Sequence, residues 1–160
     1  MLRVLFTKIE EGDAAVTSDL ADMLAAHMTV EHELFYPVAR DIEEELVTES
    51  FEQHALAELA LKRVLAVDPG EDLFEARVKV LKALIEQHVE HEESMLFSAA
   101  ESALAPDELE SLGLDIEFRF QEILDDGYRA TLPNTFEQTA ADIALSEQFE
   151  GDPLRPEQRP

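Results

Sequence analysis

The chain contains no cysteine among its 160 residues. This absence excludes disulfides, thiolate zinc sites, cysteine-ligated iron–sulfur clusters and cysteine nucleophiles. The chain also lacks an apolar run approaching the ~20 residues that a membrane helix needs. The apolar stretch Met1–Phe6 is too short for a signal peptide. We therefore expect a cytoplasmic protein that does not bind membranes.

Basic residues are scarce: 12 Lys and Arg stand against 37 Asp and Glu, which gives a formal net charge of −25. Such a surface repels phosphate backbones and anionic lipids, so we expect no nucleic-acid partner. The same surface concentrates metal cations near the protein. An acidic surface can equally serve only to keep a protein in solution, so the charge alone does not establish metal binding.

The chain has few helix breakers, and persistent strand-like alternation is absent. Its seven prolines and five glycines lie mostly at the borders of Ala-, Leu- and Glu-rich runs that favour helix. The pattern predicts an all-α fold, an antiparallel up-down helical bundle in one domain with a tail. The last long helix is expected to break near Gly113. Helices are predicted over residues 1–11, 14–40, 43–66, 71–103 and 106–125, with a short one over 136–149 before a loose tail.

Two segments repeat one layout, in which a His precedes a Glu by four residues: His27 with Glu31, and His88 with Glu92. Residues four apart share one face of a helix, and in both segments that face is the apolar one. A His and a carboxylate directed into a core cost several kcal/mol unless they are compensated. A metal ion compensates both, because neutral imidazole and ionised carboxylate are its natural ligands.

A third helix adds His54, which lies on an apolar stripe, and one alternative for it is a core histidine bonded to a backbone carbonyl. At ~100° per residue, His32 lies about 140° from His27 and faces outward, whereas His91 lies about 60° from His88 at the rim. Glu58 is a spare ligand or a helix-pairing residue. A ferritin-like site is disfavoured, because no His has a Glu three residues before it. The candidate metal ligands are His27, Glu31, His54, His88 and Glu92, suited to Fe, Mn or Zn.

Three motifs in order resemble the hemerythrin-like family, the HHE cation-binding domain. The run His27–Pro37 resembles its second-helix motif, and Glu52-Gln-His54 resembles its third-helix element. The run His88–Phe97 resembles its fourth-helix motif, with Ser98 where proline is usual. The resemblance covers about residues 1–113 and leaves 114–160 as a C-terminal extension. It implies an up-down four-helix bundle around a carboxylate-bridged di-iron centre held by the five candidate ligands.

One feature of the family is missing, because no His precedes His27. The family also takes a His from its first helix. Either that ligand lies upstream of Met1, or this chain lacks it and one metal has an open or water-filled position. The short first helix also leaves a groove of the bundle poorly covered. We expect the region after residue 113, a homodimer partner, or both, to cover it.

By resemblance, the function is that of a non-haem di-iron protein that binds or senses O₂, peroxide or nitric oxide, or performs modest redox chemistry. Whether it is an enzyme stays open, because the sequence offers no nucleophile or dedicated acid–base pair. One alternative is a mononuclear Zn or Mn protein. Another is a metal-free bundle that acts in protein–protein interaction.

Overall fold

The computed structural model describes residues 2–131, and residues 1 and 132–160 lie outside this part. The described residues form helices and no strand, which confirms the all-α class. The short helix and tail predicted after residue 131 fall outside the described residues. The helices are α1 (Leu2–Glu10), α2 (Thr17–Val30), α3 (Tyr36–Arg40), α4 (Glu44–Leu65), α5 (Asp72–His91), α6 (Phe97–Ala103), α7 (Pro106–Asp126) and α8 (Tyr128–Thr131), with a 3₁₀ turn η1 (Ala14–Val16) and π-helical turns η2 (Glu31–Phe35) and η3 (Glu92–Leu96).

The two π-helical turns join shorter helices into long rods, so that α2, η2 and α3 are continuous, as are α5, η3 and α6. In each turn the backbone N–H five residues after the glutamate donates to the glutamate carbonyl: Tyr36 to Glu31, and Phe97 to Glu92. Pro37 follows the first turn, but Ser98 holds the corresponding place after the second. Proline therefore does not account for both turns. Single π turns inside α-helices occur frequently at functional sites.

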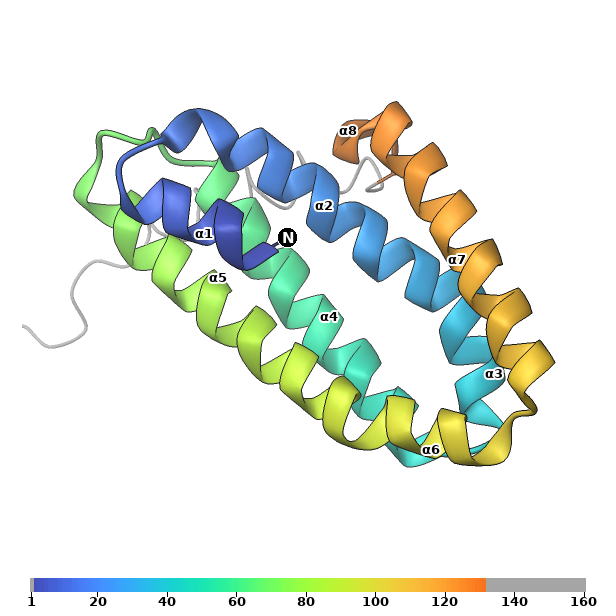
Figure 1. The fold of residues 1–160 in the computed structure, drawn as a ribbon. Coiled ribbons are helices and arrows are strands. Elements are labelled where there is room, and N and C mark those ends of the chain that lie inside the picture. The colour runs from blue at the N-terminus through green and yellow to red at the C-terminus, as the bar shows by residue number, and fades with distance from the viewer. Residues whose placement is uncertain (1, 132–160) are drawn as a thin grey trace, which may run out of the picture.

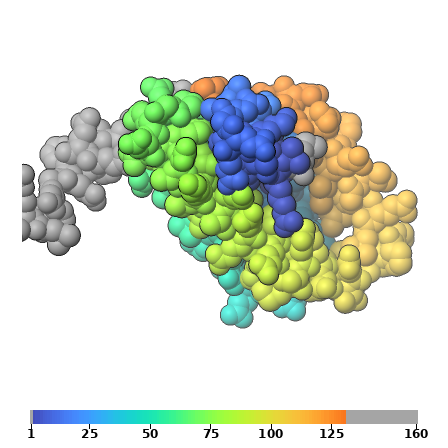
Figure 2. Space-filling view, turned by 60° about the vertical axis from the view of Figure 1, so that its left-hand side comes forward, coloured from blue at the N-terminus to red at the C-terminus, as the bar shows by residue number. Residues whose placement is uncertain are grey.

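Consecutive long helices run in opposite directions and pack side by side, as Figure 1 shows for α2, α4 and α5. The short α1 lies against α2 and α5, and its N-terminal end reaches the C-terminal half of α5 (Figure 2). Two apolar clusters fill the interior. One surrounds Phe6, Leu24 and Leu81 near α1, and the other surrounds Tyr36 and Leu96 at the opposite end. The candidate ligands lie between these clusters.

Helix α7 packs along α2 and covers its outer side. Ile123 is buried there against Ala26 and Val30. The start of α8 is fixed to α2, because the backbone N–H of Tyr128 donates to the Asp22 carboxylate at 2.7 Å. The region after residue 113 therefore covers part of the bundle on the side of α2. The expected break near Gly113 is wrong, since α7 passes through it without interruption.

The described helices include none long and apolar enough to cross a membrane.

Candidate metal centre

Three helical rods supply the candidate ligands: α2–η2–α3, α5–η3–α6 and the single helix α4. Each rod places its ligands at the same depth of the bundle. His27 lies in the last turn of α2, and Glu31 opens the π turn that follows. His88 and Glu92 repeat this arrangement at the end of α5. His54 faces them from the middle of α4. All are buried except His27, whose side chain is 21% exposed.

The imidazole nitrogens converge on one point. His88 Nε2 lies 2.9 Å from His54 Nε2 and 3.3 Å from His27 Nε2. Two ligands that bind one metal at ~2.0–2.2 Å, at adjacent corners of a tetrahedron or octahedron, lie roughly 2.8–3.6 Å apart. The spacing of the three rings therefore matches that of atoms sharing a cation.

The carboxylates approach the same point from two sides. Glu31 Oε2 lies 3.1 Å from His54 Nε2, and Glu31 Oε1 lies 3.2 Å from His27 Nδ1. Glu92 Oε2 lies 3.4 Å from His88 Nε2. The oxygens thus extend the cluster of nitrogens into a mixed nitrogen and oxygen donor set, the set that Fe, Mn and Zn accept.

The hydrogen bonding of the protein alone leaves this cluster incomplete. Glu31 Oε2 is enclosed and accepts no hydrogen bond, because its contact with His54 lacks hydrogen-bond geometry. An enclosed acceptor without a partner costs about 1–3 kcal/mol, and more if it is charged. A cation would use this lone pair together with those of the facing imidazole nitrogens. The residues present therefore fit a bound metal.

Burial controls the protonation of these groups in the metal-free protein. Burial raises the pKa of Glu31 to about 8. Burial, with repulsion from Glu31, raises the pKa of Glu92 to about 7. Burial lowers the pKa values of His27, His54 and His88, and the neighbouring histidines lower those of His27 and His54 further. The imidazoles are therefore neutral and ready to bind a cation, whereas the carboxyl groups must release protons to do so.

Two further side chains, Gln53 and Tyr36, fix the orientation of the cluster. Gln53 Oε1 lies 3.1 Å from His88 Nδ1, while its amide nitrogen donates to Glu49. The His88 Nδ1–H therefore donates to Gln53, which leaves Nε2 unprotonated and available to a metal. The Tyr36 hydroxyl donates to Glu92 Oε1 at 2.7 Å and lies 3.2 Å from His54 Nε2.

His32 lies closer to the cluster than the helical angle predicted. Its ring is exposed, as expected, but His32 Nε2 lies 2.8 Å from His54 Nδ1. The helical angle gave only the direction of His32 from the axis of its own helix, and His54 of α4 lies on that side. The sequence reasoning also missed Tyr36 and Gln53. Two features of the sequence could have indicated these residues: Tyr36 lies five residues after Glu31, and Gln53 directly precedes His54.

The remaining candidates lie outside the cluster. His91 Nε2 lies 3.9 Å from the Glu49 carboxylate and takes part in no hydrogen bond. His91 therefore lies at the rim of the cluster, as predicted. Glu58 forms an ion pair with Lys62, four residues further along α4. This is the helix-pairing alternative for Glu58.

Two cavities reach His27 from the surface. One, of about 420 Å³, lies under α7 between Phe97, Ile116 and Phe120, with His27 and Glu31 also in its lining. The other, of about 390 Å³, lies between α1 and α5. A small molecule can therefore approach the cluster on the side of His27.

The metal-free protein should lose stability as the pH rises above neutrality. A carboxyl group whose pKa is 4.5 when unfolded and about 8 when folded stabilises the fold below pH 4.5, and this contribution disappears as the pH rises through 8. The buried histidines act oppositely, because their lowered pKa values destabilise the fold as the pH falls below 6.5. We therefore expect the melting temperature of the metal-free protein to be highest near pH 6.5 and to fall as the pH rises toward 8. Glu31→Gln should reduce the fall between pH 6 and pH 9, and an equal fall in both proteins would contradict this origin.

Comparisons with known proteins agree with the motifs. The family model described as the hemerythrin HHE cation-binding domain matches residues 2–100. A protein named DNA nickase from Nostoc sp. (strain PCC 7120) is 27% identical over 115 residues, which cover 68% of this chain and 33% of that protein. The chain thus spans about a third of this relative's length. No solved structure matches. Because the family model covers more than half of the chain and confirms the resemblance, the chain belongs to the hemerythrin HHE cation-binding family.

Proposed function

We propose that the chain is a non-haem di-iron protein that binds or senses O₂, peroxide or nitric oxide, or performs modest redox chemistry with them. The observation that carries the proposal is the convergence of three imidazoles and two carboxylates from three helical rods, with Glu31 Oε2 left without a hydrogen bond. The ligands would be His27, Glu31, His54, His88 and Glu92. We also propose that α1, α2–α3, α4 and α5–α6 are the four helices of an up-down bundle.

Two metals are favoured by the distribution of the carboxylates. Glu31 contacts His27 with one oxygen and His54 with the other, so both of its oxygens would be available to a bound metal pair. Glu92 approaches His88 and is held from behind by Tyr36. A bound iron pair would supply reversible binding and reduction of small oxygen or nitrogen oxide molecules.

The chain's own residues would set the conditions for this chemistry. The apolar clusters on both sides shield the cluster from water, except on the side of His27. Gln53 holds the proton on His88 Nδ1, and Tyr36 holds the Glu92 carboxylate in place. Both cavities reach the cluster on the side of His27. That side is where an exchangeable small molecule would bind.

A mononuclear Zn or Mn site is the second candidate, and one observation favours it. His27, Glu31, His54 and His88 each offer a donor atom, and these four atoms all lie within 4.8 Å of one another. Four such ligands suffice for one zinc ion. Glu92 would then act as a hydrogen-bonding neighbour of His88.

We do not propose DNA nicking for this chain, although the Nostoc relative is named DNA nickase. The matched region is 33% of that protein. The net charge of −25 opposes contact with DNA phosphates. Absence of nucleic-acid binding therefore stays a prediction for this chain.

Anaerobic loading with Fe(II), followed by a metal count and an optical spectrum after exposure to air, tests the proposal. We expect about two Fe per chain and near-ultraviolet absorption from an oxo-bridged pair, as dinuclear ligation predicts. One tightly bound Zn or Mn per chain without that absorption would support the mononuclear candidate. Failure to retain any metal would contradict both and leave the metal-free bundle.

A further inference from the structure

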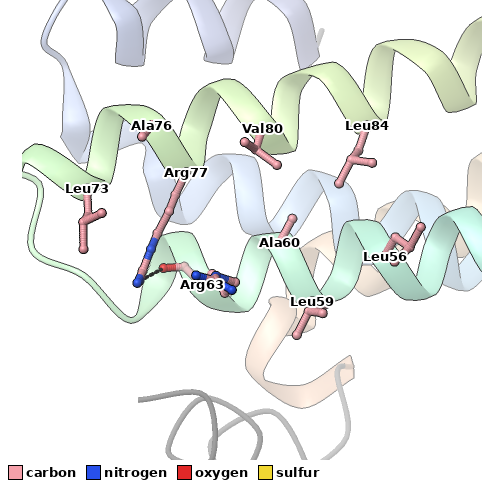
Figure 3. A pocket seen from close by; sticks show the side chains of 9 residues that line it. All are labelled: Leu56, Leu59, Ala60, Arg63, Leu73, Ala76, Arg77, Val80 and Leu84. Atoms are coloured by element: carbon pink, nitrogen blue, oxygen red, sulfur yellow. Dashed lines mark hydrogen bonds between the residues drawn. The ribbon is translucent and has the colours of Figure 1, made fainter. Parts of the chain in front are cut away.

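The outer surface between α4 and α5 carries an apolar groove that is separate from the candidate metal centre. The groove has a volume of about 450 Å³. Figure 3 shows Leu73, Val80 and Leu84 of α5 directed toward α4. Leu56, Leu73 and Val80 are 54%, 53% and 57% exposed, and Leu59 is 39% exposed. These are four of the eight large apolar side chains that are exposed among the described residues.

The spacing of these residues is that of a helix-packing seam. On α4 the positions 56, 59 and 63 are separated by three and four residues, and on α5 the positions 73, 77, 80 and 84 by four, three and four. This alternation places side chains along one stripe of a helix that packs against another helix. The opposite faces of both helices already fill the core, with Leu61 and Leu81 fully buried. Each helix thus has two packing faces, of which one has no cover in the described residues.

The charges along α4 indicate what covers this face. Glu52 precedes Leu56 by four residues, and Arg63 follows Leu59 by four. Both charged residues are exposed. If a second α4 lies antiparallel across the midpoint between Leu56 and Leu59, each Glu52 faces an Arg63 and each Leu56 faces a Leu59. A surface that complements itself in this way makes a two-fold symmetric contact.

The groove also differs in charge from the rest of the molecule. Two chains of net charge −25 repel each other over most of their surfaces. This face instead contains Arg63 and Arg77, and the Arg77 side chain donates to the Arg63 carbonyl at 2.7 Å (Figure 3). We propose that the α4–α5 groove is a homodimer interface in which the two copies pack α4 against α4 in antiparallel orientation. This proposal does not depend on the metal.

Sedimentation equilibrium of the full chain tests the dimer. The expected mass is twice the 18.0 kDa of one chain. Leu59→Glu and Val80→Glu place charges in the seam and should each yield monomers. Phe118→Glu, at a residue 69% exposed on α7, is the matched control and should remain dimeric. Circular dichroism of each variant separates loss of the dimer from loss of the fold.

The antiparallel register has its own test. Glu52→Arg and Arg63→Glu each place like charges opposite one another and should weaken dimerisation several-fold, whereas the double exchange should restore it. Additive weakening in the double variant would overturn this register. A full chain that is monomeric at about 100 μM, where a dimer with a Kd of ~1 μM would be almost fully formed, would overturn the interface. A dimer that persists in both seam variants would overturn it as well.

Discussion

Replacing His88 with alanine is expected to lower metal affinity at least ~100-fold, because His88 is the member of the cluster that contacts all the others. Its Nε2 lies 2.9 Å from His54, 3.3 Å from His27 and 3.4 Å from Glu92, and 3.9 Å from Glu31 Oε2. Removing the ring therefore withdraws one donor and separates the others from their common neighbour. Metal retained per chain after gel filtration measures the effect.

His91→Ala is the matched control for this experiment. His91 lies on the same helix, three residues away, and its Nε2 is nearest to Glu49 rather than to the cluster. It should retain nearly the metal content of the unchanged protein. Since His88 is 1% exposed, circular dichroism of the metal-free variant must show a folded chain before its metal content is interpreted. Equal losses in the two variants would mean that the metal binds elsewhere.

Metal loading is expected to raise the melting temperature by roughly 10 °C. A ligand present at 1,000 times its dissociation constant stabilises the folded state by about 4 kcal/mol, and ~1 kcal/mol corresponds to about 2–4 °C in a chain of this size. The stabilisation has a local source, because the cation would pair with the ionised Glu31 and with imidazoles that otherwise face one another. A chelator should reverse the shift.

The same measurement on His88→Ala provides the control, because a general effect of divalent cations on an acidic surface should survive that substitution. With a net charge of −25, such a general effect is a real alternative. We expect no shift above one or two degrees in His88→Ala, about the size of a surface ion effect. An unchanged melting temperature in the unsubstituted protein would contradict stabilisation by a buried metal.

Helical periodicity was sufficient to predict the rods and the convergence of five side chains. The predicted helix over 14–40 corresponds to α2, η2 and α3, and that over 71–103 corresponds to α5, η3 and α6. The His-x3-Glu spacing placed each pair on the buried face, because four residues span about one turn. The sequence alone did not establish the metal, and the role of the five residues as ligands stays a proposal.

The contacts of Tyr36, Gln53 and His32 with the cluster could not be derived in the same way. Tyr36 reaches Glu92 on another rod, and Gln53 reaches His88 from α4. Such contacts depend on distances between helices, which a single sequence does not contain. The contact of His32 with His54 depends in the same way on the position of α4. The predicted boundary between the bundle and the C-terminal extension at residue 113 rested on where the family motifs end. It falls within the uninterrupted α7.

The groove between α4 and α5 could not be identified as an external surface from the sequence. Leu56, Leu59, Leu73 and Val80 are visible in the sequence as a second apolar seam. Helix period alone assigns such residues to a core as readily as to an interface. Only the packing of the opposite face, where Leu61 and Leu81 are enclosed, identifies the seam as external.

Anomalous X-ray diffraction from crystals of the iron-loaded protein, recorded at the iron absorption edge, would locate the bound iron directly. We expect anomalous density within ~2.0–2.2 Å of the Nε2 atoms of His54 and His88 and of a Glu31 oxygen. Density confined to exposed acidic residues, or a buried cluster whose imidazoles remain in contact with no iron between them, would contradict this expectation.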